Sequence, residues 1–516
     1  MTSSKLRAPL YEALRRHRAA KPRSYHVPGH AQGRAYAGRD EALDYAAILS
    51  LDVTELSGTD DLHQPEGAIL EAQQLAAATF GAEESCFLVG GSTAGNLALI
   101  LAHLRPGDIL VLQRNVHKSV IHGLQLAQAS AVFVDPHVDP STGLALVPTL
   151  SALREALQSY PQAKAVLLSN PSYYGLGVQL APYVELVHSY GLPLLVDEAH
   201  GAHFGLHPEL PGSALQAGAD AVVQSTHKTL TAMTMGAMLH MQGDRIDRFA
   251  IRQMLQLIQS SSPSYPIMAS LDIARAMIDG EGSTLFEPAL RAADRFRRRL
   301  PVETGFVTAD LVHHTDSFAI RNAVEVYYDP LRVAIRDRTC RLSGYDLQSS
   351  LEARGCWAEM ADAVYVVLLF GISTRDEDID ALLAALQQIG AACAAEQQSS
   401  DAATASHVDG DCRAISRTPD RSLATSSAAH SEPVSFDLHT ARDQASEAVD
   451  LTTAEGRIAA EMIVPYPPGI PLVYAGECLT FAVLEQLQQL AVLGARCQGA
   501  TDPSLRTIRV WATKTV

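Results

Sequence analysis

Two short apolar runs, each followed at once by polar residues, constrain this chain more than any other feature. Residues 192–196 are apolar and few, as expected of a buried strand, and Asp197 comes directly after them. Residues 221–223 form a second such run, and a Ser-x-His-Lys sequence that ends at Lys228 follows it. Because ligands of open α/β sheets bind at the carboxyl ends of the strands, we expect these polar side chains to share one site.

A carboxylate and a lysine at this edge favour the chemistry of an aldehyde cofactor. The lysine amine can form a Schiff base with the aldehyde, and the carboxylate can keep a pyridinium nitrogen protonated. Taken singly, Asp197 has the position of a helix cap or turn residue, and a Ser-x-His-Lys sequence is most often found on surfaces. The two together, in this order on two strand ends, form a much more specific signal.

At this point the segments 196–201 and 225–228 resemble the Orn/Lys/Arg decarboxylase family of pyridoxal-phosphate enzymes. The resemblance implies the aspartate-aminotransferase fold (fold type I), an α/β fold. Its large domain has a mostly parallel sheet, and its C-terminal domain is a smaller α+β domain. It also implies that Lys228 carries pyridoxal 5′-phosphate and that Asp197 holds the ring nitrogen. His200 would contact the ring or the substrate carboxylate, and Lys228 or a nearby histidine would return a proton to Cα.

The glycine-rich turn 90–96, between an apolar strand and a helix start, suits the cofactor phosphate. Its backbone N–H groups and the helix dipole favour an anion, although such a turn alone is more often a plain loop. The residues that the resemblance assigns to the cofactor are Ser92, Thr93, Ala94, His117, Asp197, His200, Ser225, His227, Lys228 and Ser261. Lys228, His200 and His117 are the expected catalytic residues.

Three of the predicted roles are supplied by the resemblance alone. His117 would stack its imidazole on the cofactor ring and shield the ring from water. Ser261, in a serine-rich loop, would contact the phosphate of a neighbouring subunit, so we expect a homodimer or a multiple of dimers. Glu461 would face the distal cation of a basic substrate, and a structural salt bridge is an equally weighted alternative.

Other segments extend the resemblance over nearly the whole chain, with departures at Ala31, at Gly90 and at residues 474–475, just before Gly476-Glu477. The matching segments are residues 26–30, 52–67, 170–175, 329–331, 344–346 and 461–471. Ala31 stands where the family usually has a lysine, and Gly90 where it commonly has an asparagine. The decarboxylase core begins almost at once, which indicates the short form of the family and not the large ring assemblies of its longer members.

Composition limits the partners and the cellular setting. The chain has 516 residues, 47% of them hydrophobic and 19% charged, as in an ordinary globular protein. A formal charge of −17 argues against nucleic acid as a partner. Seven cysteines without CxxC pairs or metal-ligand spacing suggest reduced thiols in a cytoplasm and no metal. Residues 1–23 have no apolar core, and glycines interrupt the uncharged residues 85–104, so we expect neither a secretory signal nor a membrane span.

The pattern predicts five parts of the chain. They are residues 1–60 (N-terminal segment), 61–284 (pyridoxal-phosphate domain), 285–394 (small α/β domain), 395–448 (disordered insert) and 449–516 (C-terminal decarboxylase domain). The insert is rich in Ser, Ala, Thr, Asp and Gln and poor in aromatics, so it lacks the apolar surface that would offset the cost of ordering it.

We therefore expect decarboxylation of a basic amino acid in polyamine metabolism, with arginine favoured over lysine and ornithine. Another pyridoxal enzyme of the same fold, an aminotransferase or a lyase, is the alternative. An aminotransferase normally needs an arginine for the substrate carboxylate late in its small domain, and the sequence does not identify one. A third possibility is a pyridoxal-binding regulator without activity. An intact set of Asp197, His200 and Lys228 argues against it, as does the lack of a recognisable DNA-binding module.

Overall fold

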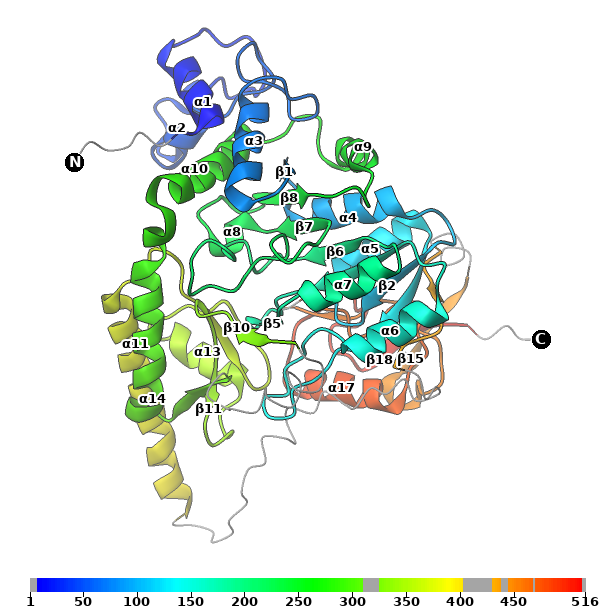
Figure 1. Ribbon diagram of the computed structural model, residues 1–516. Helices are drawn as coiled ribbons and strands as arrows, with labels where there is room; N and C mark the ends of the chain where they lie inside the picture. Colours follow the sequence, from blue (N-terminus) through cyan, green and yellow to red (C-terminus); the bar gives the residue numbers. More distant parts are fainter. Residues whose placement is uncertain (1–6, 310–323, 402–428, 438–443, 467–468, 513–516) are drawn as a thin grey trace. The chain divides into compact units, whose positions relative to one another are not determined.

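The computed structural model describes residues 7–309, 324–401, 429–437, 444–466 and 469–512, and Figure 1 shows its elements. The fold is mixed α/β with a large, mostly parallel sheet, as the sequence predicts. The chain divides into two compact units. The first comprises Met1–Leu104, Lys164–Leu168 and Tyr183–Leu285, and the second comprises Arg105–Ala163, Ser169–Pro182 and Phe286–Val516. These units do not follow the five expected parts, which stay predictions.

Strands of the first unit run in the order β1-β8-β7-β6-β4. Their bounds are β1 Glu84–Leu88, β8 Ala237–Met241, β7 Ala221–Gln224, β6 Leu194–Asp197 and β4 Ala165–Ser169. Strands β6 and β7 are parallel, whereas β8 is antiparallel to both β7 and β1. Nearly every residue of these strands is buried, which explains why apolar residues predominate in them and do not alternate with polar ones.

The first unit also contains a set of α-helices. They are α1 Pro9–Ala19, α2 Glu41–Leu49, α3 Ala68–Phe80, α4 Gly91–His103, α7 Ala181–Ser189, α8 Thr226–Thr229, α9 Arg248–Ile258 and α10 Tyr265–Glu281. Helix α4 packs against β1, β7 and β8, and against α9. A Cβ at Gly95 would lie 2.9 Å from side-chain atoms of both Leu88 and Val223, so this glycine allows α4 to approach the strands closely. The start of α4 is thereby fixed relative to the strands that carry the predicted site.

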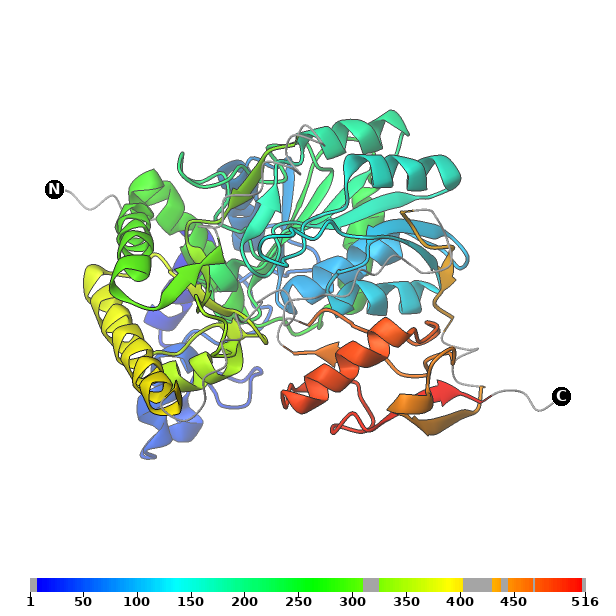
Figure 2. The same cartoon turned by 90° about the horizontal axis from the view of Figure 1, so that it is seen from below.

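The second unit contains parallel strands β2 (Ile109–Gln113) and β3 (Ser130–Val134), with helices α5 (Lys118–Ala127) and α6 (Leu150–Ser159). It also contains an antiparallel sheet of order β12-β13-β11-β9. The bounds are β12 Met360–Ala361, β13 Val366–Leu369, β11 Arg332–Asp337, β9 Phe306–Thr308, α11 Glu287–Glu303, α13 Gly344–Glu352 and α14 Asp376–Asp401. Helices α11 and α14 lie side by side in both views (Figures 1 and 2).

The C-terminal part of the second unit has its own core. Its elements are β15 Ser446–Asp450, β16 Val464–Pro465, α17 Phe481–Val492, β17 Cys497–Gln498 and β18 Thr507–Trp511. In Figure 2, α17 lies beside the β15–β18 pair, and its Val483, Leu484 and Leu487 share one buried cluster with Ile508 and Val510 of β18. Elsewhere in this unit, β5 (Leu176–Val178) pairs with β10 (Val326–Tyr328).

Part of the expected disordered insert is ordered, which corrects the sequence-based interpretation. Strand β14 (Val434–Ser435) pairs with β3, and Phe436 is buried against the rings of Phe133 and Tyr474. Helix α14 also extends to Asp401. A single buried aromatic residue, Phe436, anchors this short segment. The sequence around it has few apolar residues, so composition alone does not indicate that it is ordered. Residues 402–428 of the insert lie outside the described residues.

Two further sequence-based expectations concern thiols and membranes. Cys340 is disulfide-bonded, so the expectation of reduced thiols is wrong for this residue. Among the described residues, Cys86, Cys356, Cys478 and Cys497 are free thiols. Across the described ranges, none of the helices combines the length and the apolar composition needed to cross a bilayer.

Phe436→Ala tests whether the 429–437 segment is part of the core. Removing a buried phenylalanine side chain should lower the free energy of unfolding by about 3–5 kcal/mol, measured by chemical denaturation. Ser435→Ala, on the exposed residue beside it, is the control and should change little. A neutral Phe436→Ala variant would restore the original interpretation of the whole insert.

Candidate active site

Lys228 lies in a short helical turn directly after β7. Its backbone N–H donates to Ser225 O at 3.0 Å, and His227 is fixed by bonds from its N and Nδ1 to Gly236 O at 3.1 and 2.9 Å. The Lys228 Nζ atom lies 3.1 Å from Nε2 of His200. The structure therefore brings together two side chains that are 28 residues apart in sequence and that were both predicted to be catalytic.

Asp197 ends β6, beside the end of β7, because the parallel register pairs Asp197 with Val223. The carboxylate is 6% exposed and accepts hydrogen bonds from Asn96 Nδ2 at 2.8 Å and from Ala199 N at 3.2 Å. Asn96 is a residue that the sequence analysis missed as a functional group. It is the last residue of the glycine-rich turn motif. Its contact with Asp197 depends on how α4 packs against the sheet, which the sequence does not indicate.

The start of helix α4 has the features expected of a phosphate site. No side chain caps the helix at Gly90, and Gly91 has a φ of +72° that lets the chain turn sharply from β1 into the helix. Ser92 and Thr93 are accessible, whereas Ala94 is buried under the first turn. A helix start with uncapped N–H groups attracts an anion.

Pyridoxal phosphate fits the residues present in the first unit. The hydroxyl of Ser225 is fully buried and has no hydrogen-bond partner among the described residues, and the same holds for Thr229 Oγ1. Buried hydroxyls without partners are costly unless a bound group satisfies them. Together with an amine, a carboxylate and an anion-binding helix start, these hydroxyls match the aldehyde, ring nitrogen and phosphate of this cofactor.

His117 belongs to the second unit and caps helix α5. Its Nδ1 lies 2.8 Å from Ser119 Oγ and accepts from Ser119 N at 3.2 Å. Gly469 packs over the imidazole, since a Cβ on this residue would lie 3.2 Å from both Cδ2 and Nε2 of His117. The Gly469 carbonyl also accepts a hydrogen bond from Lys118 N at 3.1 Å. The proline-dense segment thus holds His117 in one orientation; stacking on the cofactor stays a prediction.

The predicted site roles of Ser261 and Glu461 stay predictions, and the structure describes the surroundings of both residues. The loop 260–262 is exposed, and His63 Nε2 lies 2.8 Å from Ser260 O. Glu461 is 8% exposed and already accepts from Thr501 N at 2.8 Å, from Thr501 Oγ1 at 2.6 Å and from Arg509 N at 2.9 Å. Both carboxylate oxygens of Glu461 therefore hold backbone of the C-terminal part in place.

Arg332, in β11 of the second unit, is an arginine that the sequence did not single out. It is 2% exposed, and its Nη1 donates to Tyr173 O at 3.1 Å. Its Nε and Nη2 atoms are buried and have no partner among the described residues. A buried guanidinium with unused donors is a typical carboxylate-binding group.

Comparisons with known proteins agree on one family. Residues 8–378 match the family described as "Orn/Lys/Arg decarboxylase, major domain", and residues 422–500 match the corresponding C-terminal domain. Relatives include "Uncharacterized protein YaaO" of Bacillus subtilis, 39% identical over 96% of both chains. Another is an arginine decarboxylase of the same organism, 32% identical over 97% of both chains. The solved lysine decarboxylase LdcF of Francisella novicida has the same fold, with a TM-score of 0.78 and 20% identity over 98% of this chain and 82% of that chain.

Gly469→Ala tests whether the packing over His117 matters. The variant adds a methyl group 3.2 Å from the imidazole and forces alanine into a left-handed conformation. Because the predicted stacking of His117 on the cofactor ring requires this orientation of the imidazole, we expect kcat to fall about tenfold. Gly476→Ala is the matched control: its φ is +95°, and its new methyl group would meet nothing within 4 Å. Equal losses in both variants would assign the effect to backbone strain alone.

Proposed function

Because the chain belongs to the Orn/Lys/Arg decarboxylase family, we propose that it releases CO₂ from the α-carboxyl group of a basic amino acid, with arginine favoured. The contact between Lys228 Nζ and His200 Nε2, beside a buried Asp197, is the observation that carries the proposal. Relatives named arginine decarboxylase are 30–32% identical, whereas those named lysine decarboxylase are 24–25% identical. This difference supports arginine.

Pyridoxal 5′-phosphate is the cofactor of the family, and when bound it supplies an electron sink for the electron pair that CO₂ leaves on Cα. Lys228 would hold it through Nζ, and Asp197 would pair with its ring nitrogen. The two hydrogen bonds that Asp197 accepts, from Asn96 and Ala199, hold its carboxylate in place at the end of β6. The α4 start, with Ser92, Thr93 and Ala94, and the Ser225 hydroxyl would hold the phosphate end.

Each CO₂ released requires one proton at Cα, and the Lys228–His200 pair is suited to supply it. Nζ and Nε2 lie within one hydrogen bond of each other, so a proton on either group can pass to the other. His227 anchors the turn that carries Lys228 through its two bonds to Gly236 O. His117 would cover the opposite face of the ring and exclude water.

We also propose an oligomeric state, a location and a metabolic role. We propose a homodimer or a multiple of dimers, supported by the exposure of the 260–262 loop, from which Ser261 would reach a partner subunit. We propose the cytoplasm as the location of the activity. We also propose a role in polyamine metabolism, because decarboxylating a basic amino acid yields an amine with a second cationic group. Amino transfer is the second candidate, favoured by buried Arg332, whose Nε and Nη2 atoms have no partner within the described part of the chain.

Release of CO₂ from arginine, lysine and ornithine, each offered separately to purified holoenzyme, tests the function. We expect the highest kcat/KM with arginine, because its relatives of that name are the more similar ones. Borohydride reduction should attach the cofactor to the peptide that contains Lys228, and Lys228→Ala should lower kcat by several orders of magnitude. Lys164→Ala, on an exposed lysine of the same unit, is the control. With a second 2-oxo acid added as the amino acceptor, conversion of the basic amino acid to its own 2-oxo acid without CO₂ release would establish amino transfer instead.

Glu461→Gln separates a substrate contact from a structural role. The new amide would face N–H donors of Thr501 and Arg509, so at least one hydrogen bond is lost. We expect the unfolding free energy to fall by about 1–3 kcal/mol, with KM for the basic amino acid unchanged. Glu485→Gln, on an exposed residue of α17, is the control. A sharp rise in KM at unchanged stability would assign Glu461 to the distal cation of the substrate.

A further inference from the structure

Four polar side chains form a continuous buried chain across the sheet of the first unit. Each comes from one of four neighbouring strands or strand ends: Glu198 after β6, Gln224 at the end of β7, His240 in β8 and Ser85 in β1. Gln224 Nε2 donates to Glu198 Oε2 at 2.7 Å, His240 Nε2 lies 3.2 Å from Gln224 Oε1, and Ser85 Oγ lies 2.7 Å from His240 Nδ1. None of the four is more than 3% exposed.

The chain is costly to bury and must be fully paired to persist. The other oxygen of Glu198 accepts from Ala214 N at 2.8 Å, so amide N–H groups are its partners on both sides. Burial raises the pKa of Glu198 to about 8 and lowers the pKa of His240 to about 3. A neutral imidazole has one N–H donor and one acceptor, so His240 can link its two neighbours in only one direction at a time.

The hydrogen bonds of the chain can therefore run in either of two directions. With Glu198 ionised, donation runs from Ser85 through His240 and Gln224 to the carboxylate. With Glu198 protonated, its O–H donates to Gln224 and the direction reverses at every member, once the Gln224 amide turns over. In both cases the three hydrogen bonds between the four side chains are kept, and each member depends on its neighbours.

Two members of the chain are direct neighbours of site residues. Glu198 follows Asp197, and its backbone N–H donates to Val223 O at 2.9 Å, across to β7. The turn that carries His200 wraps around the Glu198 side chain, since a Cβ at Gly201 would lie 2.7 Å from Glu198 Cγ. Gln224 directly precedes Ser225, where the polypeptide leaves β7 for the Lys228 turn. The Glu198–Gln224 bond thus joins β6 and β7 at the point where both lead into the site.

We propose that Glu198 and Gln224 are positioning residues, whose hydrogen bond, supported by His240 and Ser85, sets the Asp197–His200 turn against the Ser225–Lys228 turn. The inference rests on the proposed function, because it assigns the cofactor to these two turns. Neither Glu198 nor Gln224 would touch the reacting atoms. Their effect is to hold Lys228 Nζ within reach of His200 Nε2.

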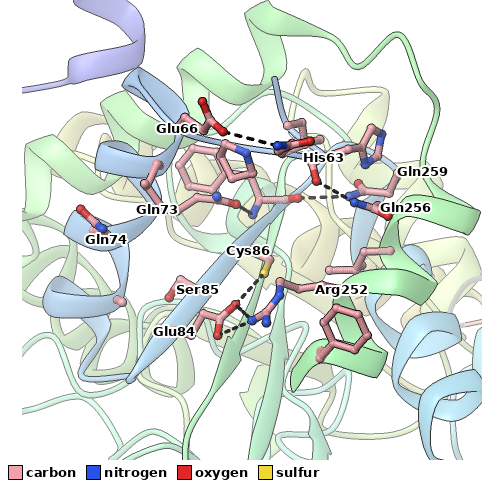
Figure 3. A pocket seen from close by; sticks show the side chains of 18 of the residues that line it. His63, Glu66, Gln73, Gln74, Glu84, Ser85, Cys86, Arg252, Gln256 and Gln259 are labelled. Atoms are coloured by element: carbon pink, nitrogen blue, oxygen red, sulfur yellow. Dashed lines mark hydrogen bonds and ion pairs between the residues drawn. The ribbon is translucent and has the colours of Figure 1, made fainter. Parts of the chain in front are cut away.

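The far end of the chain borders a pocket of about 680 Å³ beside the edge of β1, shown in Figure 3. Ser85 lines this pocket, and helices α3 and α9 contribute much of its wall. Gln73 and Gln259 reach across to the outer edge of β1, where Gln73 Oε1 accepts from Phe87 N and Gln259 Oε1 accepts from Val89 N, both at 2.8 Å. His240 and Gln224 separate Ser85 from Glu198 in the row of hydrogen-bonded side chains, so removing the Ser85 hydroxyl disturbs the site least directly.

Visible circular dichroism of the bound cofactor, recorded on holoenzyme without substrate, is the main measurement. Glu198→Leu and Gln224→Leu should weaken the cofactor band and lower kcat about tenfold or more, with KM changed less than about threefold. Glu198→Gln should keep both readouts near wild type, because an amide can donate to Gln224 and still accept from Ala214 N. Gln242→Leu is the control, since Gln242 bonds the Leu215 and Ala219 carbonyls in the same unit, outside the chain.

A milder pair of variants keeps the inference testable should the leucine variants fail to fold. Ser85→Ala removes one end of the chain and Glu198→Gln alters the other, so the two should be coupled through Gln224 and His240. We expect their combined effect on the cofactor band and on kcat to differ by about threefold or more from the product of the single effects. Independent effects, or folded leucine variants with a wild-type cofactor band, would overturn the inference. A normal cofactor band with no CO₂ release would contradict the proposed function alone.

Discussion

The parallel pairing of β6 with β7 is the interaction on which the site depends. Its register puts Asp197 opposite Val223, so both strands reach the same edge of the sheet together. Without this register the Lys228 Nζ and His200 Nε2 atoms, which come from different turns, would not lie 3.1 Å apart. Helix α4 adds the third component, because Gly95 lets it sit close enough for Asn96 to bind Asp197. A change of one residue in register would turn the polar side chains to the other face.

Sequence patterns were sufficient for the strand ends because burial on both faces leaves a visible apolar run there. The α/β class and the family could both be predicted in this way. Contacts that arise between distant segments could not. Asn96 and Glu198 sit inside motifs that the sequence displays, yet their partners are set by how α4 and β7 pack. Nothing in the local pattern of either residue indicates which side chain it will meet.

Composition misled in one region and was silent in another. Residues 429–437 look unable to order themselves, but one buried ring, Phe436, and two strand residues are enough when a sheet edge is already present. For Glu461 the sequence left a substrate contact and a structural salt bridge equally weighted, whereas its oxygens accept hydrogen bonds from Thr501 and Arg509. In both cases the deciding partner is tens to hundreds of residues away along the chain.

The glutamines at the edge of β1 have a consequence for how the protein behaves at high concentration. An open sheet edge offers N–H and C=O groups to any extended peptide, and such edges promote aggregation. Here Gln73 and Gln259 occupy the outward N–H groups of Phe87 and Val89, so an incoming strand must first displace two side-chain amides. The first unit thereby resists growing by strand addition while its edge keeps the hydrogen bonds that a neighbouring strand would have made.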